Sequence, residues 1–189
     1  CNMILGPTTA EALSANDAPF SDVAVDHVFA GYIAYCANEG IISGYADGTF
    51  RPAAPLTGYA FMKMLLGALG YDAVNEGYVG TNWSIQVAKR ALNIGLNKGL
   101  DGDFVGAKAL TREEACLYAF NTLKADMVEY ANDSKITVGD IVISNSSKAE
   151  VCDANEYDGR IDDDGDLQFA EQYFTKLALK KSQADAFGR

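Results

Sequence analysis

The stretch GYADGTFRPAAPLT, residues 44–57, contains the signals that decide the fold. Asp47 and Gly48 are typical of a tight turn, because glycine tolerates positive φ and aspartate hydrogen-bonds its own backbone. Phe50 is expected to pack the loop onto neighbouring helices, and two prolines lower the entropy of the unfolded chain. Thr57 precedes apolar residues at helical spacing, so its hydroxyl is expected to cap a helix. The stretch therefore predicts a rigid loop that leads into a capped helix.

The same order of residues recurs later in the chain. The two copies begin at Gly40 and Gly95 and match after a one-residue gap at Ala46. Apolar residues at helical spacing precede each copy, over 28–36 and 83–92, and predict a helix there. The repeat therefore predicts two helix–loop–helix units. The matching pairs are Gly44 and Gly99, Asp47 and Asp101, Gly48 and Gly102, Phe50 and Phe104, and Thr57 and Thr111.

The second unit has the stronger helix-start signal. Thr111 and Glu114 have the spacing of a capping box, in which the threonine hydroxyl and the glutamate carboxylate satisfy each other's backbone amides. The first unit has Ala60 at the matching position and lacks the second half of the box. We expect both Thr57 and Thr111 to cap helices.

The composition excludes several classes of function. The net charge of −11 opposes binding to nucleic acid or to an anionic membrane, and no run of apolar residues is long enough to span a membrane. His27 is the only histidine, which nearly excludes a histidine metal cluster or a Ser-His-Asp triad. Cys36 and Cys116 lie among apolar residues at helical spacing and are expected to be buried and reduced.

The two ends of the chain match neither copy. Residues 1–17 are expected to be either a poorly packed arm or the remnant of a secretory signal, with a lipidated Cys1 as a weaker third alternative. Residues 131–189 show no third copy. Within them, alternation over 134–147 predicts one or two strands with a turn at Gly139-Asp140, and residues 167–179 predict a terminal amphipathic helix. The closing residues suggest a native chain that continues further.

An acidic segment lies between these predicted strands and the terminal helix. Residues 153–166 loosely resemble the calcium loops of dockerin or EF-hand type, in which alternate oxygens surround the cation. The spacing departs from that pattern by at least one residue. A solvated acidic loop is therefore the default interpretation, and calcium is the alternative.

Taken in order, these motifs resemble the S-layer homology (SLH) module, the repeat that attaches surface proteins to bacterial cell walls. The F-x-D-V opening of the family corresponds to Phe20–Val23, and its G-I-x-x-G-Y-x-D-G-T-F-x-P loop is nearly complete over 40–52. The second unit is more diverged but keeps Trp83 at the tryptophan position and LTREE over 110–114. The resemblance covers about residues 18–130.

The resemblance implies a helical module that usually works in threes, packed as a pseudo-threefold prism. We therefore expect a mainly α fold with two tandem SLH-like units, residues 18–74 and 75–130. They follow the N-terminal segment 1–17 and precede a small mixed α/β segment, residues 131–189, with short strands, an acidic loop and a helix.

The resemblance also implies a site. Grooves between units of this family bind secondary cell-wall polysaccharide, commonly with a pyruvate ketal, and an arginine grips the carboxylate through two parallel hydrogen bonds. That arginine corresponds to Arg112, and Gly58 replaces it in the first unit; Val28 likewise replaces the tryptophan. A composite groove would combine the first loop with the second unit's Arg112 and Trp83. The implied glycan-binding residues are Arg112, Trp83, Asp47, Gly48, Thr49, Arg51 and Gly102.

Each of these residues also has a purely structural interpretation. Trp83 is equally explained as a core aromatic, and Arg112 as an exposed side chain that is unpaired or paired with Glu113. Asp47 and Asp101 are more often turn-formers than ligands.

The function expected from the sequence is non-catalytic anchoring of a secreted protein to the bacterial cell envelope, outside the cell in the cell wall or S-layer. The expected partner is a cell-wall polysaccharide, with or without pyruvate, and no cofactor or nucleic acid. One alternative is a structural subunit that self-assembles into an S-layer-like array or filament. A glycosidase built on paired carboxylates is a further rival with weak support.

Overall fold

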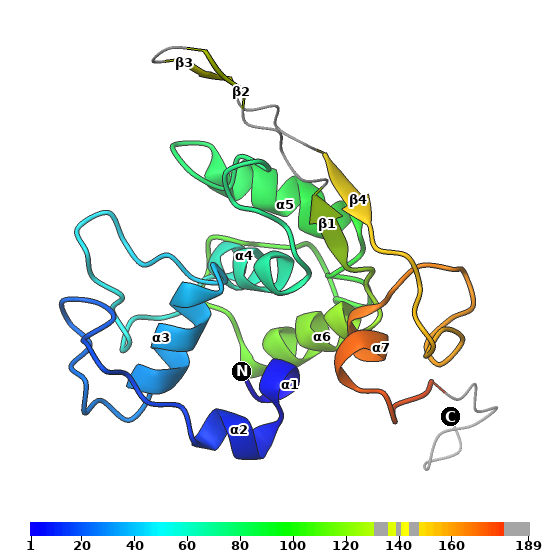
Figure 1. The fold of residues 1–189 in the computed structure, drawn as a ribbon, viewed down its shortest axis with the longest axis horizontal. Helices are drawn as coiled ribbons and strands as arrows, with labels where there is room; N and C mark the ends of the chain where they lie inside the picture. The colour runs from blue at the N-terminus through cyan, green and yellow to red at the C-terminus, as the bar shows by residue number, and fades with distance from the viewer. Residues whose placement is uncertain (131–135, 139–140, 144–147, 180–189) are drawn as a thin grey trace.

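The computed structural model describes residues 1–130, 136–138, 141–143 and 148–179. Within these residues the fold is mainly helical, as the sequence predicted, with short antiparallel strand pairs after the second unit (Figure 1). The elements in chain order are α1 (Asn2–Leu5), α2 (Pro7–Glu11), α3 (Ala30–Asn38), α4 (Gly58–Ala68), α5 (Trp83–Asn93), α6 (Arg112–Leu123), β1 (Val128–Tyr130), β2 (Ile136–Val138), β3 (Ile141–Ile143), β4 (Ala149–Val151) and α7 (Phe169–Tyr173).

Both repeats form a helix, a loop and a second helix. The first unit contains α3 and α4, and the second contains α5 and α6. α3 begins later than the predicted span 28–36, because Phe29 has φ −109° and ψ 10° and still lies outside the helix. Val28 and Phe29 are therefore 77% and 56% exposed, so they do not belong to the buried face that the apolar spacing suggested.

Both predicted threonine caps are confirmed. The Thr57 hydroxyl accepts a hydrogen bond from the Ala60 amide at 3.2 Å, and the Thr111 hydroxyl accepts one from the Glu114 amide at 3.1 Å. In return the Glu114 carboxylate accepts from the Thr111 amide at 2.9 Å, which completes the capping box.

The ends of the two loops are joined directly by backbone hydrogen bonds. The Leu110 amide donates to the Leu56 carbonyl at 2.7 Å, and the Tyr59 amide donates to the Gly106 carbonyl at 2.9 Å. Thr57 and Ala109 form an antiparallel bridge between them. The starts of α4 and α6 are thereby placed next to each other.

Most of the buried apolar residues belong to one core around α4. This helix packs against both α5 and α6 (Figure 1), and segments after the second unit close the core. Its buried residues are Met62, Leu65, Leu66, Leu69, Tyr71, Tyr78, Val87, Ala91, Leu96, Tyr118, Val128 and Phe169.

A smaller core lies beneath the first loop. Val23, Ala30 and Ile33 are buried there, and Phe20 and Phe50 pack against them. The two phenylalanine rings stack with centroids 5.3 Å apart. The expected role of Phe50 in packing the loop is confirmed.

The N-terminal segment is better packed than expected. α1 contacts α7 (Figure 1), and Met3 and Ile4 pack against the main core. Ala10 in α2 is fully buried. Apolar side chains of α1 thus cover apolar surface of the main core near α7.

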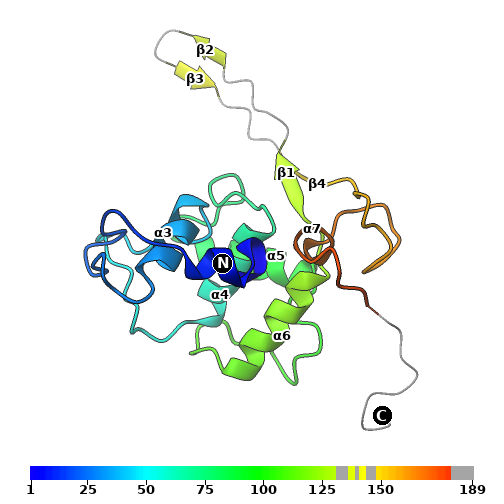
Figure 2. The ribbon, with the colours of Figure 1, turned by 60° about the horizontal axis from the view of Figure 1, so that its bottom comes forward.

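The segment after the second unit contains two strand pairs. β1 pairs with β4, so the second unit shares a ladder with the later segment (Figure 2). β2 pairs with β3 in antiparallel register, as the alternation predicted, while the predicted turn at Gly139-Asp140 lies outside the described residues. The closing residues 180–189 lie outside them as well.

The terminal helix is shorter than predicted. α7 ends at Tyr173, because Phe174 leaves helical geometry with φ −126° and ψ 60°. Phe169, Ala170 and Glu171 form its buried side, whereas Leu177 is partly exposed beyond its end.

The expectation for the cysteines is only partly met. All four are free thiols, but Cys116 is exposed and Cys36 is half-buried. In α6 the buried side is formed by Glu114, Tyr118 and Thr122. Cys116 lies two residues from both Glu114 and Tyr118, which places it on the opposite face of a helix with 3.6 residues per turn. Burial of Cys116 was a wrong prediction.

The caps give a first quantitative test. We expect Thr57→Ala to lower the free energy of unfolding by about 1 kcal/mol, because one helix amide loses its partner. Thr111→Ala is expected to cost more, since the Glu114 carboxylate also accepts from the Thr111 hydroxyl at 3.0 Å. Denaturant titration measures both, with Thr81→Ala in an exposed loop as the control. Equal stability of all four proteins would contradict the caps.

Gly70 gives a second test, at the junction of α4 and β1. It has φ +100°, and a Cβ there would collide with the Val128 carbonyl oxygen. We expect Gly70→Ala to cost at least ~3 kcal/mol, because backbone strain and a steric clash add. Gly80→Ala is the matched control, since Gly80 has φ +73° but open space around it, and should cost about 1 kcal/mol. Similar denaturation midpoints for the two variants would show that the α4–β1 contact is not as described.

Candidate functional site

The first loop presents a compact polar cluster of Asp47, Thr49 and Arg51. Arg51 Nη2 lies 2.7 Å from Asp47 Oδ2, and Arg51 Nε donates to Thr49 Oγ1 at 3.1 Å. Thr49 Oγ1 in turn donates to Asp47 Oδ1 at 2.6 Å. Hydrogen bonds from Thr49 and then Arg51 lower the pKa of Asp47 to about 2. The three side chains therefore form one charged surface, with the guanidinium already paired to a carboxylate.

The Asp22 side chain holds the backbone of this cluster in place. The Asp22 carboxylate accepts hydrogen bonds from the Phe50 and Arg51 amides, each at 2.8 Å, and these bonds lower the pKa of Asp22. Arg51 has φ 60°, a conformation uncommon for a residue other than glycine. The Arg51 guanidinium also lies 4.1 Å from the centroid of the Tyr45 ring. The loop is thus rigid, as its sequence predicted.

Arg112 lies at the first position of α6, and its side chain is exposed. None of the ion pairs recorded for the described residues includes it, so pairing with Glu113 is not seen. Glu114, in the same turn, is already paired: Lys108 Nζ lies 2.8 Å from Glu114 Oε1. The Lys108 contact, followed by the Thr111 amide, lowers the pKa of Glu114. Arg112 is therefore available to a ligand, while the ion pair beside it serves the capping box.

Trp83 begins α5 and is half-buried against the main core. Its ring meets Tyr59 edge to face at a centroid distance of 6.5 Å, and Tyr59 meets Phe104 in the same way at 5.8 Å. Lys63 Nζ lies 5.6 Å from the Trp83 centroid. Trp83 therefore packs against the core, as expected for a core aromatic residue, and its ring also lies near the Lys63 ammonium.

Lys63 was not predicted as a site residue. It stands in the apolar run FMKMLL of α4, and burial lowers the pKa of its ammonium. A lone lysine inside an apolar helix pattern is the sequence signal that would have identified it. Its ammonium is 3.5 Å from the Ser43 hydroxyl, at the edge of a groove.

That groove has a volume of about 730 Å³ and lies between the end of α3, α4 and the segment after α4. None of the predicted glycan-binding residues lines it. Its polar and aromatic lining includes Glu39, Ser43, Lys63, Tyr71, Asp72 and Tyr130.

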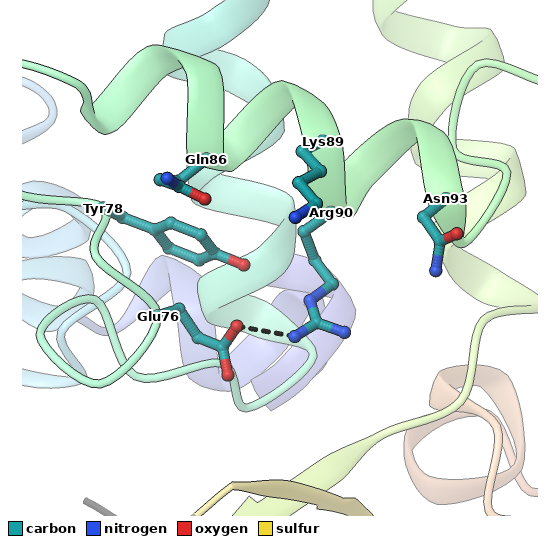
Figure 3. A pocket seen from close by; sticks show the side chains of 6 residues that line it. All are labelled: Glu76, Tyr78, Gln86, Lys89, Arg90 and Asn93. Carbon is teal, nitrogen blue, oxygen red and sulfur yellow. Dashed lines mark hydrogen bonds and ion pairs between the residues drawn. The ribbon is translucent and has the colours of Figure 1, made fainter.

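A second hollow of about 360 Å³ lies along α5 (Figure 3). Arg90 Nη2 lies 2.7 Å from Glu76 Oε2, and the Tyr130 hydroxyl donates to Glu76 Oε1 at 3.0 Å. Burial raises the pKa of Tyr78, whose hydroxyl has no hydrogen-bond partner within the described residues. The Glu76 carboxylate is thus bound by both Arg90 and Tyr130. We interpret the polar residues of this hollow as structural, because they hold the connection over residues 72–80 in place.

The predicted site residues fall into two groups. Asp47, Gly48, Thr49 and Arg51 share the first loop, while Arg112 and Trp83 belong to the second unit. Gly102 has φ +88° and open space around it, as a turn glycine requires. Across the described residues, no recorded hydrogen bond or ion pair joins the first-loop side chains to Arg112 or Trp83. The composite groove therefore stays a prediction.

The acidic segment folds into a loop closed by a bridge between Asp153 and Asp166. The Gln168 amide donates to Asp126 and Asp164 at 3.1 Å each. The buried Glu171 carboxylate accepts from the Ile161 amide at 3.0 Å. Among the described residues, no group of three or more His, Cys, Asp or Glu side chains is placed to hold a metal ion. The geometry lends the calcium alternative no support.

Comparison with known proteins gives one family match. The S-layer homology domain model matches residues 19–58, which span the F-x-D-V opening, α3 and the first loop. No solved structure gives a significant match. S-layer homology domains are non-catalytic cell-wall anchoring modules, so the match places the chain at the cell surface. In the described part of the chain, no helix is long and apolar enough to cross a membrane.

Three curated proteins are similar to this chain over most of its length. A surface layer protein of Brevibacillus choshinensis is 24% identical over 64% of the chain and 10% of its own length. An endoglucanase of Bacillus sp. (strain KSM-635) is 27% identical over 65% of the chain and 14% of its own length. A middle cell wall protein of Brevibacillus brevis is 24% identical over 58% of the chain and 10% of its own length. The chain thus spans a tenth to a seventh of these relatives.

Asp162 offers a test of the acidic loop. Partial desolvation, followed by the nearby carboxylates of Asp164 and Asp126, raises its pKa to about 6. A carboxylic acid titrates near 3.9 in an unfolded chain, so the folded form binds more protons between about pH 4 and 6. Stability should therefore fall as pH rises through this window, and Asp162→Asn should remove that part of the fall.

The measurements are a carboxyl NMR titration of Asp162 and unfolding curves across the same pH range. Asp163→Asn is the matched control, because it removes the same charge from the neighbouring position. An Asp162 midpoint near 4, or the same pH dependence in both variants, would show that neither desolvation nor the neighbouring carboxylates raise the pKa of Asp162.

Proposed function

We propose that this chain, a member of the S-layer homology domain family, attaches its protein to the bacterial cell envelope by binding secondary cell-wall polysaccharide. The observation that supports this most directly is Arg112, an exposed guanidinium outside the ion pairs of the described residues. The ligand group would be an anionic sugar substituent such as a pyruvate ketal, because a guanidinium binds a carboxylate through two parallel charge-assisted hydrogen bonds.

The position of Arg112 favours an anionic ligand for a second reason. A cation in the first turn of a helix lies near the positive end of the helix dipole, which is unfavourable unless an anion compensates. Of the two acids in this turn, Glu114 is bound to Lys108 and Thr111, and Glu113 is in none of the ion pairs recorded for the described residues. A bound carboxylate would satisfy both the guanidinium and the helix terminus.

The negative net charge of the chain is compatible with an anionic ligand when each ligand carboxylate interacts mainly with the nearest cation. A net charge of −11 repels a dense polyanion. A polysaccharide with widely spaced carboxylates presents one charge at a time, and within a Debye length of about 8 Å the nearest cation dominates. We therefore propose a neutral sugar backbone with isolated acidic groups as the substrate class.

Trp83 would bind the sugar ring. Trp83 is only half-buried, so part of its ring is available for packing against a pyranose face. Lys63 lies near the same ring and would add a hydrogen-bond donor. The first loop, with Asp47, Thr49 and Arg51 held rigid, is the second proposed contact surface.

The first unit lacks its own arginine for a steric reason. A Cβ at Gly58 would lie 3.1 Å from the Gly106 Cα and 3.3 Å from the Phe104 ring. A side chain there would require the Gly106 backbone or the Phe104 ring to shift by a few tenths of an ångström. Glycine at this position therefore fits the junction between the units, and we propose that Arg112 supplies the cation for the single site.

Self-assembly is the second candidate function, and one surface favours it. Val25, Val28 and Phe29 are each more than half exposed in the segment before α3. Neighbouring exposed apolar side chains are typical of surfaces that associate. A relative named surface layer protein is consistent with this alternative.

Catalysis is the less favoured candidate. One relative is named an endoglucanase, but this chain covers only 14% of its length. Since the S-layer homology domain is non-catalytic, we propose that the similarity lies in a shared attachment module.

Substitution of Arg112 tests the binding proposal. We expect Arg112→Ala to weaken binding to purified, pyruvylated cell-wall polymer by about 2 kcal/mol, a roughly 30-fold rise in Kd, because a charge-assisted pair is lost. Arg112→Lys should recover only part of the loss, since an ammonium cannot make two parallel bonds. Lys98→Ala is the control, because it removes the same charge from an exposed position in the second loop.

Cosedimentation with polymer and titration calorimetry measure these affinities, with depyruvylated polymer as a second control. Unfolding curves should show equal stability, since Arg112 is exposed. If Arg112→Ala binds as tightly as the original chain, Arg112 is not the carboxylate ligand. If the original chain binds no polymer but scatters light increasingly with concentration, self-assembly replaces the proposal.

A further inference from the structure

Two cysteines far apart in the sequence have their sulfur atoms in contact. Cys1 Sγ lies 3.4 Å from Cys36 Sγ, and Cys1 Sγ also lies 3.6 Å from the Tyr32 carbonyl oxygen. Cys1 immediately precedes α1, and Cys36 lies in the last turn of α3. Both thiols are half-buried. A disulfide has a sulfur–sulfur distance of about 2.0 Å, so the two sulfur atoms would have to approach by roughly 1.4 Å more to form one.

This contact lies where two separately packed parts of the chain meet. α3 belongs to the small core of Val23, Ala30 and Ile33. α1 belongs to the main core through Met3 and Ile4. The small core holds few side chains, so it stabilises the position of α3 less than the main core stabilises α4. A covalent bond between Cys1 and Cys36 would connect the two.

We propose that Cys1 and Cys36 form a disulfide that fixes α3 to the main body of the chain. Nothing in the polysaccharide proposal requires this bond, which is inferred from the sulfur contact alone. Closure of the ring from residue 1 to residue 36 removes conformations from the unfolded chain, and longer rings gain more from this effect. The bond stabilises the attachment of α3 and leaves Cys116 and Cys152 as thiols.

The groove of about 730 Å³ is the feature that this bond would affect. Ala37 and Glu39, at the end of α3, line one side of it, and Lys63 and Gly67 of α4 line the other. Ala37 follows Cys36 directly in the sequence. The disulfide therefore sets the spacing between the two walls of the groove.

The bond forms by thiol–disulfide exchange with a small-molecule disulfide such as oxidised glutathione. One cysteine thiolate attacks a sulfur of glutathione disulfide, which gives a mixed disulfide and releases one glutathione thiolate. The second cysteine thiolate then attacks the protein sulfur of the mixed disulfide and releases the second glutathione. Two protein thiols are oxidised, the glutathione disulfide is reduced, and the two protons end on the glutathione thiolates. Disulfides persist at cell surfaces, the location that the proposed function gives this chain.

The test uses the full 189-residue chain and a Cys116→Ser/Cys152→Ser variant, in which Cys1 and Cys36 are the remaining cysteines. Both are incubated with oxidised glutathione, and free thiols are then counted after denaturation. We expect the original chain to keep two of its four thiols and the double variant to keep none. Peptide mapping should join the Cys1 and Cys36 peptides within one chain, and reduction should separate them.

Thermal unfolding then measures the consequence of the bond. We expect oxidation to raise Tm by roughly 5–10 °C in the double variant, and reduction to reverse the change. Adding Cys1→Ser to that variant removes one partner and should abolish the response. Four remaining thiols in the original chain, a bridge to Cys116 or Cys152, or a bridge between chains would overturn the assignment. A mapped Cys1–Cys36 bond without a rise in Tm would overturn its role in fixing α3.

Discussion

The backbone hydrogen bonds between the two loop ends fix the geometry of both units. The Leu110 amide bonds the Leu56 carbonyl, and the Tyr59 amide bonds the Gly106 carbonyl. Each bond lies within a few residues of a threonine cap, so the pairing decides where α4 and α6 start and how they face each other. Without it, only the packing of α4 against α6 in the core would relate the two capped helices.

This constraint explains why two copies of one sequence pattern have diverged. The loop junction needs a residue without a side chain at Gly58, because Gly106 and Phe104 lie against it. The equivalent residue of the second unit faces solvent, where Arg112 is tolerated. The first unit thus provides a rigid loop and a packing surface, and the second provides the exposed cation.

Local signals predicted the local structure well. The caps at Thr57 and Thr111, the turn glycines and the packing of Phe50 depend on residues a few positions apart, so the sequence contained enough to find them. Contacts between distant segments were not predictable in this way. The approach of Lys63 to Trp83 depends on how α4 packs against α5, and no spacing rule reports that.

The errors of prediction have the same physical origin. Apolar spacing alone could not show that Phe29 lies outside α3, nor that Cys116 faces away from the core, because a helix pattern gives periodicity without a start or a direction. For the proposed site, the family resemblance indicated which residues would bind the glycan. The structure shows which of these side chains already form internal ion pairs. Arg51 is paired with Asp47, whereas no ion pair is recorded for Arg112 among the described residues. At the proposed site, a ligand carboxylate would compete with an internal partner at Arg51, whereas the described residues include no recorded ion-pair partner for Arg112. For this reason the second unit, although it is the more diverged copy, is the stronger candidate for anion binding.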